Sequence, residues 1–380
     1  MPSFKIALMP GDGIGNDILT ASQPLLDVLD LDAEYVHADI GWSHWCNEGE
    51  ALPPKTGDIL KGCRCALFGA ITSKPTGEAE QELVPRLQGK GLIYRSPILT
   101  LRKMFDLYTN MRPCKSYPGN PNNHGDNIDI TIFRENTEGL YSEIEFHPFP
   151  DELRAMVSRF NAAMDRFAAI PSQEMAVALR VITKRAASRI IRRAFEYAQN
   201  KGYRKVTLVE KANVLRETSG MMVREAHAIA ADYPRIELQI TYIDAQLMWL
   251  IKNPQDFSVM VTSNLFGDIM SDVASQLVGG LGFSASGNIG DKFAIFEPSH
   301  GSAPKYEGKF VVNPCAMLLS IKMMLDWLGE EKKASALESA IASVVKAGKV
   351  RTYDMGGKSS TLDMGRAIAD RYVEVICGRR

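Results

Sequence analysis

The sequence has no marked excess of charge of either sign and no long apolar run. Its 380 residues carry 44 lysines and arginines against 45 aspartates and glutamates, so the formal net charge is −1. Without a basic excess or a charged tail, nucleic acid is not an expected partner. The apolar runs are well short of the about 18 residues that a membrane-spanning helix needs, so we expect no membrane insertion.

Cysteine is scarce as well, with six in the whole chain. Cys63 and Cys65 lie two apart, and no second pair completes a zinc site. An apolar strand begins almost at Met1, so no signal peptide is expected, and we expect free thiols in a reducing cytoplasm. The chain is longer than a single hydrophobic core usually supports, and 45% of it is hydrophobic, so we expect two domains.

Short apolar strands alternate with longer helical stretches along the chain. Strands are expected at 4–9, 64–70, 128–133, 203–209, 236–243 and 257–261. This alternation predicts a largely parallel α/β sheet. A glycine-rich turn at 10–15 leads into a helix expected from about Asp17. Its third glycine comes one position too early for the dinucleotide fingerprint, because Asn16 stands there.

Two carboxylates follow the last of these strands. In a helix, Asp268 and Asp272 would lie on one face, one turn apart, and their charges would repel unless something positive sits between them. Open α/β sheets bind ligands at the carboxyl ends of their strands. The spacing alone leaves open a solvated surface pair or a site for Mg²⁺ or Mn²⁺.

Other polar side chains follow the remaining strand ends. Arginines have a planar fork that binds carboxylates bidentately, aspartates suit a hard cation, and a lysine acts as a base when neighbouring cations lower its pKa. These types recur at five places: Arg102 with Arg112, Arg134 with Tyr141, Lys211, Asp244, and Asp268 with Asp272. Each alone is an ordinary surface charge, whereas their joint placement at strand ends indicates an active site.

Five longer motifs resemble those of a known family. They are LRKMFDLYTNMRP at 101–113, FRENTEGLY at 133–141, VEKANVL at 209–215, NLFGDIMSD at 264–272 and HGSAPKYEGKFVVNP at 300–314. With PGDGIG at 10–15 and Gly-Gly-Lys-Ser-Ser-Thr at 356–361, they resemble the β-decarboxylating dehydrogenases, which comprise isocitrate, homoisocitrate and 3-isopropylmalate dehydrogenases. The resemblance covers nearly the whole chain.

The resemblance implies the oxidative decarboxylation of a 3-substituted malate, a hydroxy acid with two or three carboxylates. The oxidised acid would lose CO₂ after hydride transfer to a nicotinamide. The implied residues are Arg102, Arg112 and Arg134 for the carboxylates, Asp244, Asp268 and Asp272 for Mg²⁺ or Mn²⁺, and Lys211 and Tyr141 for proton transfer. In this family Lys211 and Asp244 come from the second subunit, which implies a homodimer with shared active sites.

The implied fold is α/β, with an open sheet in two domains that is not the Rossmann fold. One domain would combine residues 1–107 and 279–380 and bind the cofactor. The other, 108–278, would carry the dimer interface and a projecting arm within 142–178. The residues implied to contact NAD or NADP are Ile14, Thr72, Asn213, Glu297, His300, Gly301, Ser302, Ala303, Lys305, Tyr306, Asn313 and Tyr353.

The substrate is the least determined feature. Ser96 resembles isocitrate dehydrogenases, where a serine meets the distal carboxylate, while Ile98 resembles the apolar residue of isopropylmalate enzymes. A hydroxyl that binds its ligand discriminates more sharply than apolar contact, so we expect isocitrate or homoisocitrate first and an alkylmalate second. A non-catalytic regulatory subunit would have lost catalytic groups that are present here. A plain nucleotide-binding module would leave the arginines unexplained.

The cofactor type depends on the run after His300. Lys305 and Tyr306 resemble the NADP-specific pattern, a cation and a phenol facing the 2′-phosphate, and Val312 and Tyr353 match it as well. Gly357 departs from it, because NADP-specific members carry an arginine there. We therefore expect a modest preference for NADP.

Overall fold

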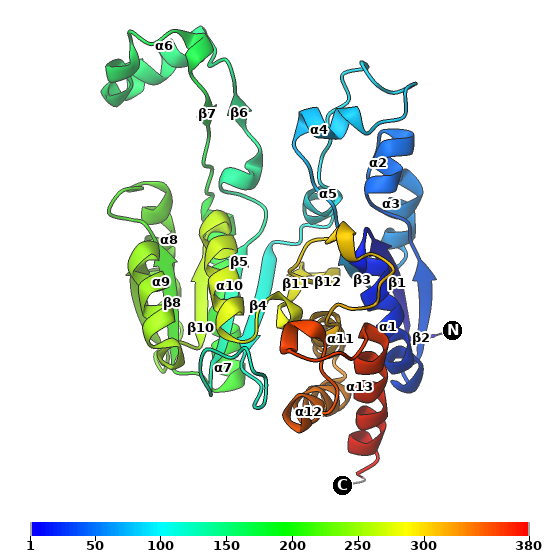
Figure 1. Ribbon diagram of the computed structural model, residues 1–380. Coiled ribbons are helices and arrows are strands. Elements are labelled where there is room, and N and C mark those ends of the chain that lie inside the picture. The colour runs from blue at the N-terminus through cyan, green and yellow to red at the C-terminus, as the bar shows by residue number, and fades with distance from the viewer. Residues whose placement is uncertain (1, 379–380) are drawn as a thin grey trace.

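The computed structural model describes residues 2–378, and one sheet of ten strands runs through it (Figure 1). The strand order is β2-β1-β3-β12-β11-β4-β5-β10-β8-β9. In chain order these strands are β1 (Phe4–Gly11), β2 (Ala33–His37), β3 (Cys65–Ala70), β4 (Thr109–Lys115), β5 (Asp129–Glu135), β8 (Lys205–Glu210), β9 (Glu237–Tyr242), β10 (Val259–Thr262), β11 (Ala285–Ile289) and β12 (Ala294–Pro298). The α/β fold with a large open sheet is as predicted, and each predicted strand is found within two residues of its expected ends.

Strand direction divides the sheet into three parts. The strands of each flank are parallel to one another: one flank is the run β2–β1–β3–β12, and the other is the run β5–β10–β8–β9. The centre is antiparallel, because β11 pairs with β12 and β4, and β4 pairs with β5. The antiparallel centre was not predicted, since hydrophobic alternation carries no information on strand direction.

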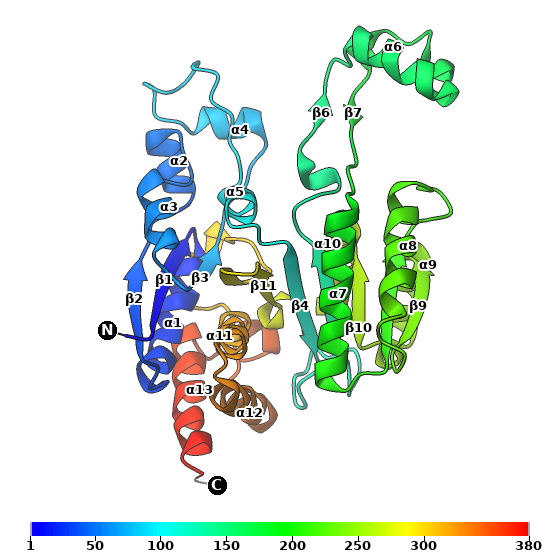
Figure 2. The ribbon, with the colours of Figure 1, turned by 180° about the vertical axis from the view of Figure 1, so that it is seen from behind.

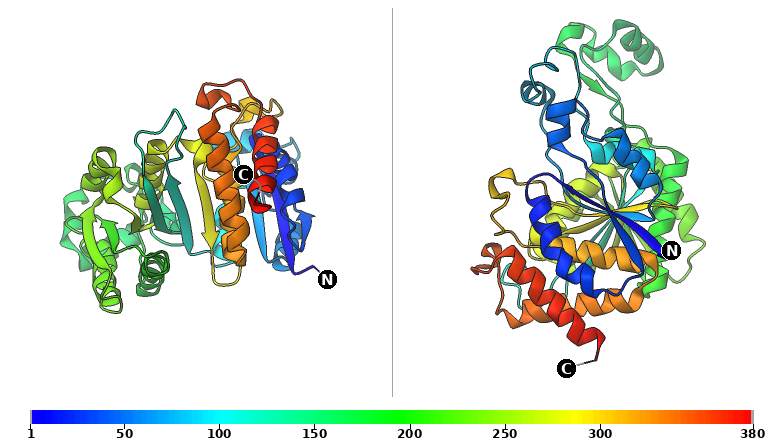
Figure 3. Two further views of the ribbon diagram at one scale, coloured as in Figure 1. Left: turned by 90° about the horizontal axis from the view of Figure 1, so that it is seen from below. Right: turned by 90° about the vertical axis from the view of Figure 1, so that its right-hand side faces the viewer.

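Helices cover both faces of both flanks (Figures 2 and 3). Alternate strand residues face opposite sides, so Ile6 and Ala7 of β1 belong to different hydrophobic clusters. The helices are α1 (Ile14–Val28), α2 (Trp42–Glu48), α3 (Pro54–Lys61), α4 (Thr76–Gln81), α5 (Pro97–Met104), α6 (Asp151–Phe160), α7 (Lys184–Lys201), α8 (Thr218–Ala230), α9 (Ile243–Lys252), α10 (Asn264–Leu277), α11 (Cys315–Leu328), α12 (Glu331–Ala347) and α13 (Thr361–Ile376). None of these helices in residues 2–378 is long and apolar enough to cross a membrane.

The molecule has two domains, seen as the two sides of Figure 1. The largest hydrophobic cluster joins α1 near the N-terminus to α11, α12 and α13 near the C-terminus. Separate clusters pack α7 and α8, and α9 and α10, on the two faces of the other flank. The exact boundaries at 107/108 and 278/279 stay a prediction.

A thin arm projects from the second domain (Figure 1). Its base is a pair of two-residue antiparallel strands, β6 (Glu145–Phe146) and β7 (Val177–Ala178). Its tip holds α6, and α6 has no buried residue. Since a helix with no buried face gains little from packing, α6 itself receives little stabilisation from the rest of its chain.

Helix α1 begins at Ile14, three residues before the expected start at Asp17. Gly13, at φ 53°, turns the chain so that the Ile14 N–H donates to Ser302 O at 2.9 Å. Asp17 is buried instead of capping the helix. Its carboxylate accepts the backbone N–H groups of Gly308 and Phe310, both at 3.1 Å. It therefore ties the segment after His300 to the helix that follows the glycine-rich turn.

Candidate active site

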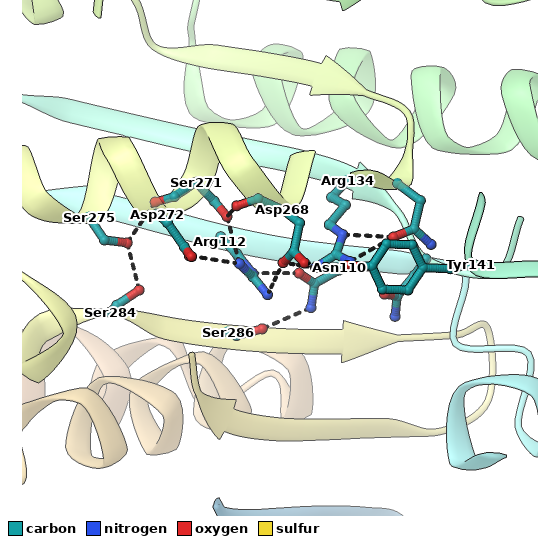
Figure 4. Close-up of polar contacts among 12 residues, drawn as sticks. Asn110, Arg112, Arg134, Tyr141, Asp268, Ser271, Asp272, Ser275, Ser284 and Ser286 are labelled. Carbon is teal, nitrogen blue, oxygen red and sulfur yellow. Dashed lines mark hydrogen bonds and ion pairs between the residues drawn. The ribbon is translucent and has the colours of Figure 1, made fainter. Parts of the chain in front are cut away.

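Asp268 is the centre of a cluster of charged side chains (Figure 4). It lies on α10, which follows β10 at the carboxyl end of the sheet. Its Oδ1 lies 2.5 Å from Arg134 Nη1 and 3.3 Å from Arg112 Nη2, and its Oδ2 accepts the Tyr141 hydroxyl at 2.6 Å. Asp272, one turn further along, pairs with Arg112 at 3.5 Å. The positive charge that the two aspartates require is thus supplied by arginines.

The charges within this cluster shift each other's protonation. Burial alone would raise the pKa of Asp268, but the charges of Arg134 and Arg112 outweigh it and lower the pKa. Burial raises the pKa of Asp272, which is further from the arginines. Burial also raises the pKa of Tyr141, helped by its hydrogen bond to Asp268, so this phenol keeps its proton at neutral pH.

The three arginines are buried, which is costly for cations. Burial lowers the pKa of Arg134 to about 9, and the positive charges of Arg112 and Arg102 add to this effect. Burial lowers the pKa of Arg102 in the same way. Three cations held close together therefore favour anionic groups between them.

Neutral oxygens orient these arginines, and the sequence reading did not identify them. Asn264 Oδ1 accepts from Arg134 Nε and Nη2 at 3.1 and 2.6 Å. Asn110 Oδ1 accepts from Arg112 Nε at 2.7 Å, and Ser271 Oγ accepts from its Nη1 at 2.6 Å. Two of these could have been found from periodicity. Asn110 lies two residues before Arg112 on the same strand face, and Asn264 lies one turn before Asp268.

The glycine of the NLFGDIMSD motif also has a steric role. A Cβ at Gly267 would stand 2.6 Å from Cγ and 2.7 Å from Cβ of Arg134. Any side chain there would push Arg134 away from α10. The ion pair between Arg134 and Asp268 therefore depends on glycine at this position.

The third arginine comes from the other domain. Arg102 lies on α5, and its Nε donates to Asn288 Oδ1 at 2.9 Å, while Nη2 lies 3.8 Å from Glu297. Burial raises the pKa of Glu297. Ser96 begins the same helix and is partly exposed, whereas Ile98 is 8% exposed and belongs to the core beneath it.

Lys211 and Asp244 lie apart from this cluster. Lys211 follows β8 and Asp244 begins α9 after β9, and the two side chains pair at 2.5 Å. Since strands are about 4.8 Å apart, β8 and β9 lie about 10 and 14 Å from β5, which carries Arg134. No three His, Cys, Asp or Glu side chains within residues 2–378 converge in a way that could hold a metal. A single chain thus brings together Asp268 and Asp272 without Asp244.

Six of the twelve expected cofactor residues line one cavity of about 530 Å³. Its lining includes Ile14, His300, Ala303, Tyr306, Asn313 and Tyr353, joined by Asp354, Asn122 and Gln276, which the sequence reading had not singled out. Thr72 lies beside this region, where its hydroxyl meets the Ser302 hydroxyl at 2.6 Å. Gly301 adjoins His300, and Glu297 instead contacts Arg102 and Asn288. Asn213 is exposed near Lys211 in the other domain.

The residues expected at a 2′-phosphate lie together at the surface. The Tyr306 and Tyr353 rings are 5.8 Å apart, and Lys305 Nζ lies 4.8 Å from the Tyr306 ring. A hydrogen bond with Tyr353 lowers the pKa of Tyr306, with help from Lys305. A Cβ at Gly357 would stand 2.0 Å from Arg351 O, so this turn has no room for an arginine.

Known proteins resemble this chain throughout its length. Residues 5–368 match the family profile described as isocitrate/isopropylmalate dehydrogenase. The chain is 42% identical over 375 residues to a 3-isopropylmalate dehydrogenase of Methanothermobacter thermautotrophicus, covering 98% of this chain and 100% of that protein. It is 40% identical over 367 residues to protein DlpA of Legionella pneumophila, covering 97% of this chain but only 58% of that protein's length.

A solved structure agrees with both matches. The crystal structure of isocitrate dehydrogenase from Methylococcus capsulatus has a TM-score of 0.84 and 36% sequence identity to this chain, with 99% of this chain and 100% of that chain covered. The fold therefore has relatives at the level of sequence and of structure. The chain belongs to the isocitrate/isopropylmalate dehydrogenase family of β-decarboxylating oxidoreductases.

Proposed function

We propose that this protein catalyses the oxidative decarboxylation of a 3-substituted malate of the isocitrate or homoisocitrate type, with hydride transfer to NAD(P)⁺. The observation that carries this proposal is the set of three buried arginines, of which Arg112 and Arg134 contact Asp268. Each guanidinium can bind one carboxylate through two parallel hydrogen bonds. A substrate with two or three carboxylates would neutralise cations that the chain itself only partly balances.

The preference for a tricarboxylate is supported by the helix that carries Arg102. Ser96 is partly exposed at the start of α5, where its hydroxyl can meet a third carboxylate. Ile98 is largely occupied by core packing, which leaves little of it to contact an alkyl group. The second candidate is an alkylmalate, favoured by the 3-isopropylmalate dehydrogenase relative.

Two side chains of this protein would move protons. Tyr141 keeps its phenolic proton because burial raises its pKa, so it can protonate the substrate carbon after CO₂ leaves. Lys211 would assist removal of the hydroxyl proton during hydride transfer to the nicotinamide. The Asp244 carboxylate, whose Oδ1 lies 2.5 Å from Lys211 Nζ, would hold this side chain in place.

The carboxylates fit Mg²⁺ or Mn²⁺, since both ions prefer oxygen ligands and often keep water and substrate oxygens. Asp268 and Asp272 would hold such an ion from one chain, with Asp244 as the third ligand. A bound divalent cation would stabilise negative charge that develops on the substrate oxygen during the reaction. Arg134 and Arg112, which contact Asp268, would hold the substrate carboxylates beside it.

We further propose that the active site is completed in a homodimer. One chain leaves Lys211 and Asp244 about two and three strands away from Arg134. The same side of the domain exposes an apolar group on α9 and α10: Met248 at 69%, Ile251 at 53%, Ile269 at 47% and Trp249 at 45%. Exposed apolar patches of this kind mark protein interfaces. The domain spanning 108–278 would carry this interface, and the domain made of 1–107 and 279–380 would bind the cofactor.

The cofactor we propose is NADP with a modest preference over NAD. Lys305, Tyr306 and Tyr353 form a small surface group with one cation and two phenols, which suits a phosphate dianion. The tight turn at Gly357 leaves no room for the arginine that would make this preference strong.

The test is a substrate panel with the purified native protein. Isocitrate, homoisocitrate and 3-isopropylmalate are compared with each cofactor, with Mg²⁺ or Mn²⁺ and after EDTA treatment. We expect the highest kcat/KM with a tricarboxylate and no turnover without metal. Turnover of none of these acids would refute the proposal, and a preference for 3-isopropylmalate would reverse the order of the two candidates. Turnover by this chain alone would also exclude a purely regulatory role.

A further inference from the structure

A single buried amide, that of Asn288 on β11, connects the arginines of the two domains. Its Oδ1 accepts from Arg102 Nε at 2.9 Å, from Asn110 Nδ2 at 3.1 Å and from Asn136 Nδ2 at 2.9 Å. Asn288 itself has no exposed surface. No charged, glycine or periodic signal marks this residue in the sequence, and it stands more than 150 residues from each of these partners.

The path continues from Asn110 to the second arginine. Asn110 Oδ1 accepts from Arg112 Nε at 2.7 Å, so Arg102 and Arg112 are joined through two amide groups. Strand register reinforces this link, because Asn288 and Asn110 are paired residues of the antiparallel β11 and β4. The distance between the two guanidinium groups is therefore set by the sheet rather than by flexible side chains.

The other end of the Asn288 amide binds a buried carboxylate. Its Nδ2 donates to Glu297 Oε1 at 2.6 Å, which fixes the amide orientation, because only the nitrogen can donate to a carboxylate. Three donors then share the oxygen on the opposite side. Both polar atoms of this buried amide are thus hydrogen-bonded, which favours a single orientation of its side chain.

Neutrality is the property that matters chemically. A carboxylate at this position would hold Arg102 just as well but would cancel the charge that the guanidinium offers to a substrate. An amide oxygen orients Arg102 and leaves its positive charge available for a bound anion. Arg102 and Arg112 carry like charges that repel each other, and after burial this repulsion adds to the lowering of the pKa of Arg102. The two amides hold the guanidinium groups in place against this repulsion.

We propose that Asn288 is a positioning residue that holds Arg102 at a fixed distance from Arg112, so that both guanidinium groups face one bound hydroxy acid. This inference rests on the proposed function and adds to it how the carboxylate-binding geometry is set. Asn288 acts through the arginines and does not itself contact the substrate. Its loss should therefore raise the KM for the hydroxy acid more than it lowers kcat.

The test compares three variants of the full-length protein. Asn288→Ala removes the amide, and Asn288→Asp keeps its size and an acceptor oxygen for Arg102. Asn120→Ala is the matched control, since Asn120 is also buried but its amide bonds the backbone at Val278 and Asn122. Circular dichroism and the Tm report the folded state of each.

In Asn288→Ala we expect the KM for the hydroxy acid to rise about tenfold or more, equivalent to about 1.4 kcal/mol, with kcat and the cofactor KM changing less. In Asn288→Asp the new carboxylate should pair with Arg102 and raise this KM further at pH 8. Because it would lie beside Glu297, it should take up a proton readily, so the KM should fall toward the native value as the pH is lowered. A purely structural effect would not depend on pH in this way.

Each contrary result has a distinct meaning. If both Asn288 variants turn over with a hydroxy-acid KM within twofold of native, Asn288 does not position the arginines. An equal KM increase in Asn120→Ala would assign the effect to general loosening and would also overturn the inference. If the native protein turns over no hydroxy acid, the proposed function itself fails, and this inference with it.

Discussion

Replacing Asp268 with asparagine removes one negative charge from the centre of the active site and keeps its size. In the native protein this carboxylate contacts Arg134 at 2.5 Å, Arg112 at 3.3 Å and the Tyr141 hydroxyl at 2.6 Å. The amide retains one acceptor oxygen, and Arg134 keeps its two hydrogen bonds to Asn264. We expect the free energy of unfolding to fall by about 1–2 kcal/mol, because a charge-assisted hydrogen bond becomes a neutral one.

This loss of stability is smaller than that caused by breaking a fully buried ion pair, which is about 3–5 kcal/mol. The Asp268 side chain is 32% exposed, so water screens part of the interaction. The effect on activity should be larger, since the same carboxylate is a proposed metal ligand. We expect kcat/KM to fall at least 100-fold, which corresponds to about 2.7 kcal/mol of transition-state stabilisation.

The pH dependence of stability gives an independent check. The folded protein lowers the pKa of Asp268 below its ordinary value of about 3.9. A lowered folded pKa stabilises the protein above the unfolded pKa, and this contribution is lost as the pH falls through the folded pKa. The difference in unfolding free energy between native and Asp268→Asn protein should thus be constant from pH 6 to 8 and should shrink below about pH 4.

The assay combines denaturant unfolding at several pH values with steady-state kinetics. The control is Asp232→Asn, which breaks an exposed pair with Arg192 at 3.2 Å and should change stability by at most about 0.5 kcal/mol and activity not at all. The reasoning is refuted if Asp268→Asn keeps kcat/KM within about threefold of native. It is also refuted if EDTA-treated native enzyme is fully active without added metal.

Three further predictions concern the dimer, the substrate and the cofactor. Mixing inactive Lys211→Ala and Arg134→Ala proteins should restore part of the activity after subunit exchange, because one site of each heterodimer holds both native residues. If heterodimers form and stay inactive, each active site is built from one chain. Ser96→Ala should lower kcat/KM for a tricarboxylate by an amount equivalent to about 1.5–3 kcal/mol and leave kcat/KM for an alkylmalate nearly unchanged. An equal loss with both substrates would mean that the hydroxyl does not take part in substrate recognition. Lys305→Asp combined with Tyr306→Ile should shift the kcat/KM ratio toward NAD, and an unmoved ratio would show that these side chains do not face the 2′-phosphate.

Local patterns in the sequence predicted the elements and the charged part of the site. Asp268 and Asp272 lie one turn apart on a helix, and Arg134 lies at the end of a strand, because helix and strand periodicity fix such relations over a few residues. Motif resemblance extended this to residues far apart, among them His300, Asn313 and Tyr353 around one cavity.

The neutral residues that hold the charges could not be predicted in the same way. Asn288 meets Arg102 and Asn110 only because β11 enters the centre of the sheet antiparallel to β4. Strand direction and order are set by tertiary packing, which leaves no local trace in composition or periodicity. The early start of α1 is a smaller case, since its first N–H group is bound by Ser302 O, almost 290 residues away.

The domain that joins both ends of the chain has a consequence for synthesis on the ribosome. Its largest core packs Ile18 of α1 against helices α11 to α13, including Leu318, which are made last. At about 5–20 residues per second, roughly 15–60 s separate the emergence of these two parts. During that time the first strands lack the packing of α11 to α13, whereas α7 to α10 and their strands can already pack on one another. The middle of the chain should therefore fold before its beginning, and the nascent N-terminal segment is where chaperones should bind.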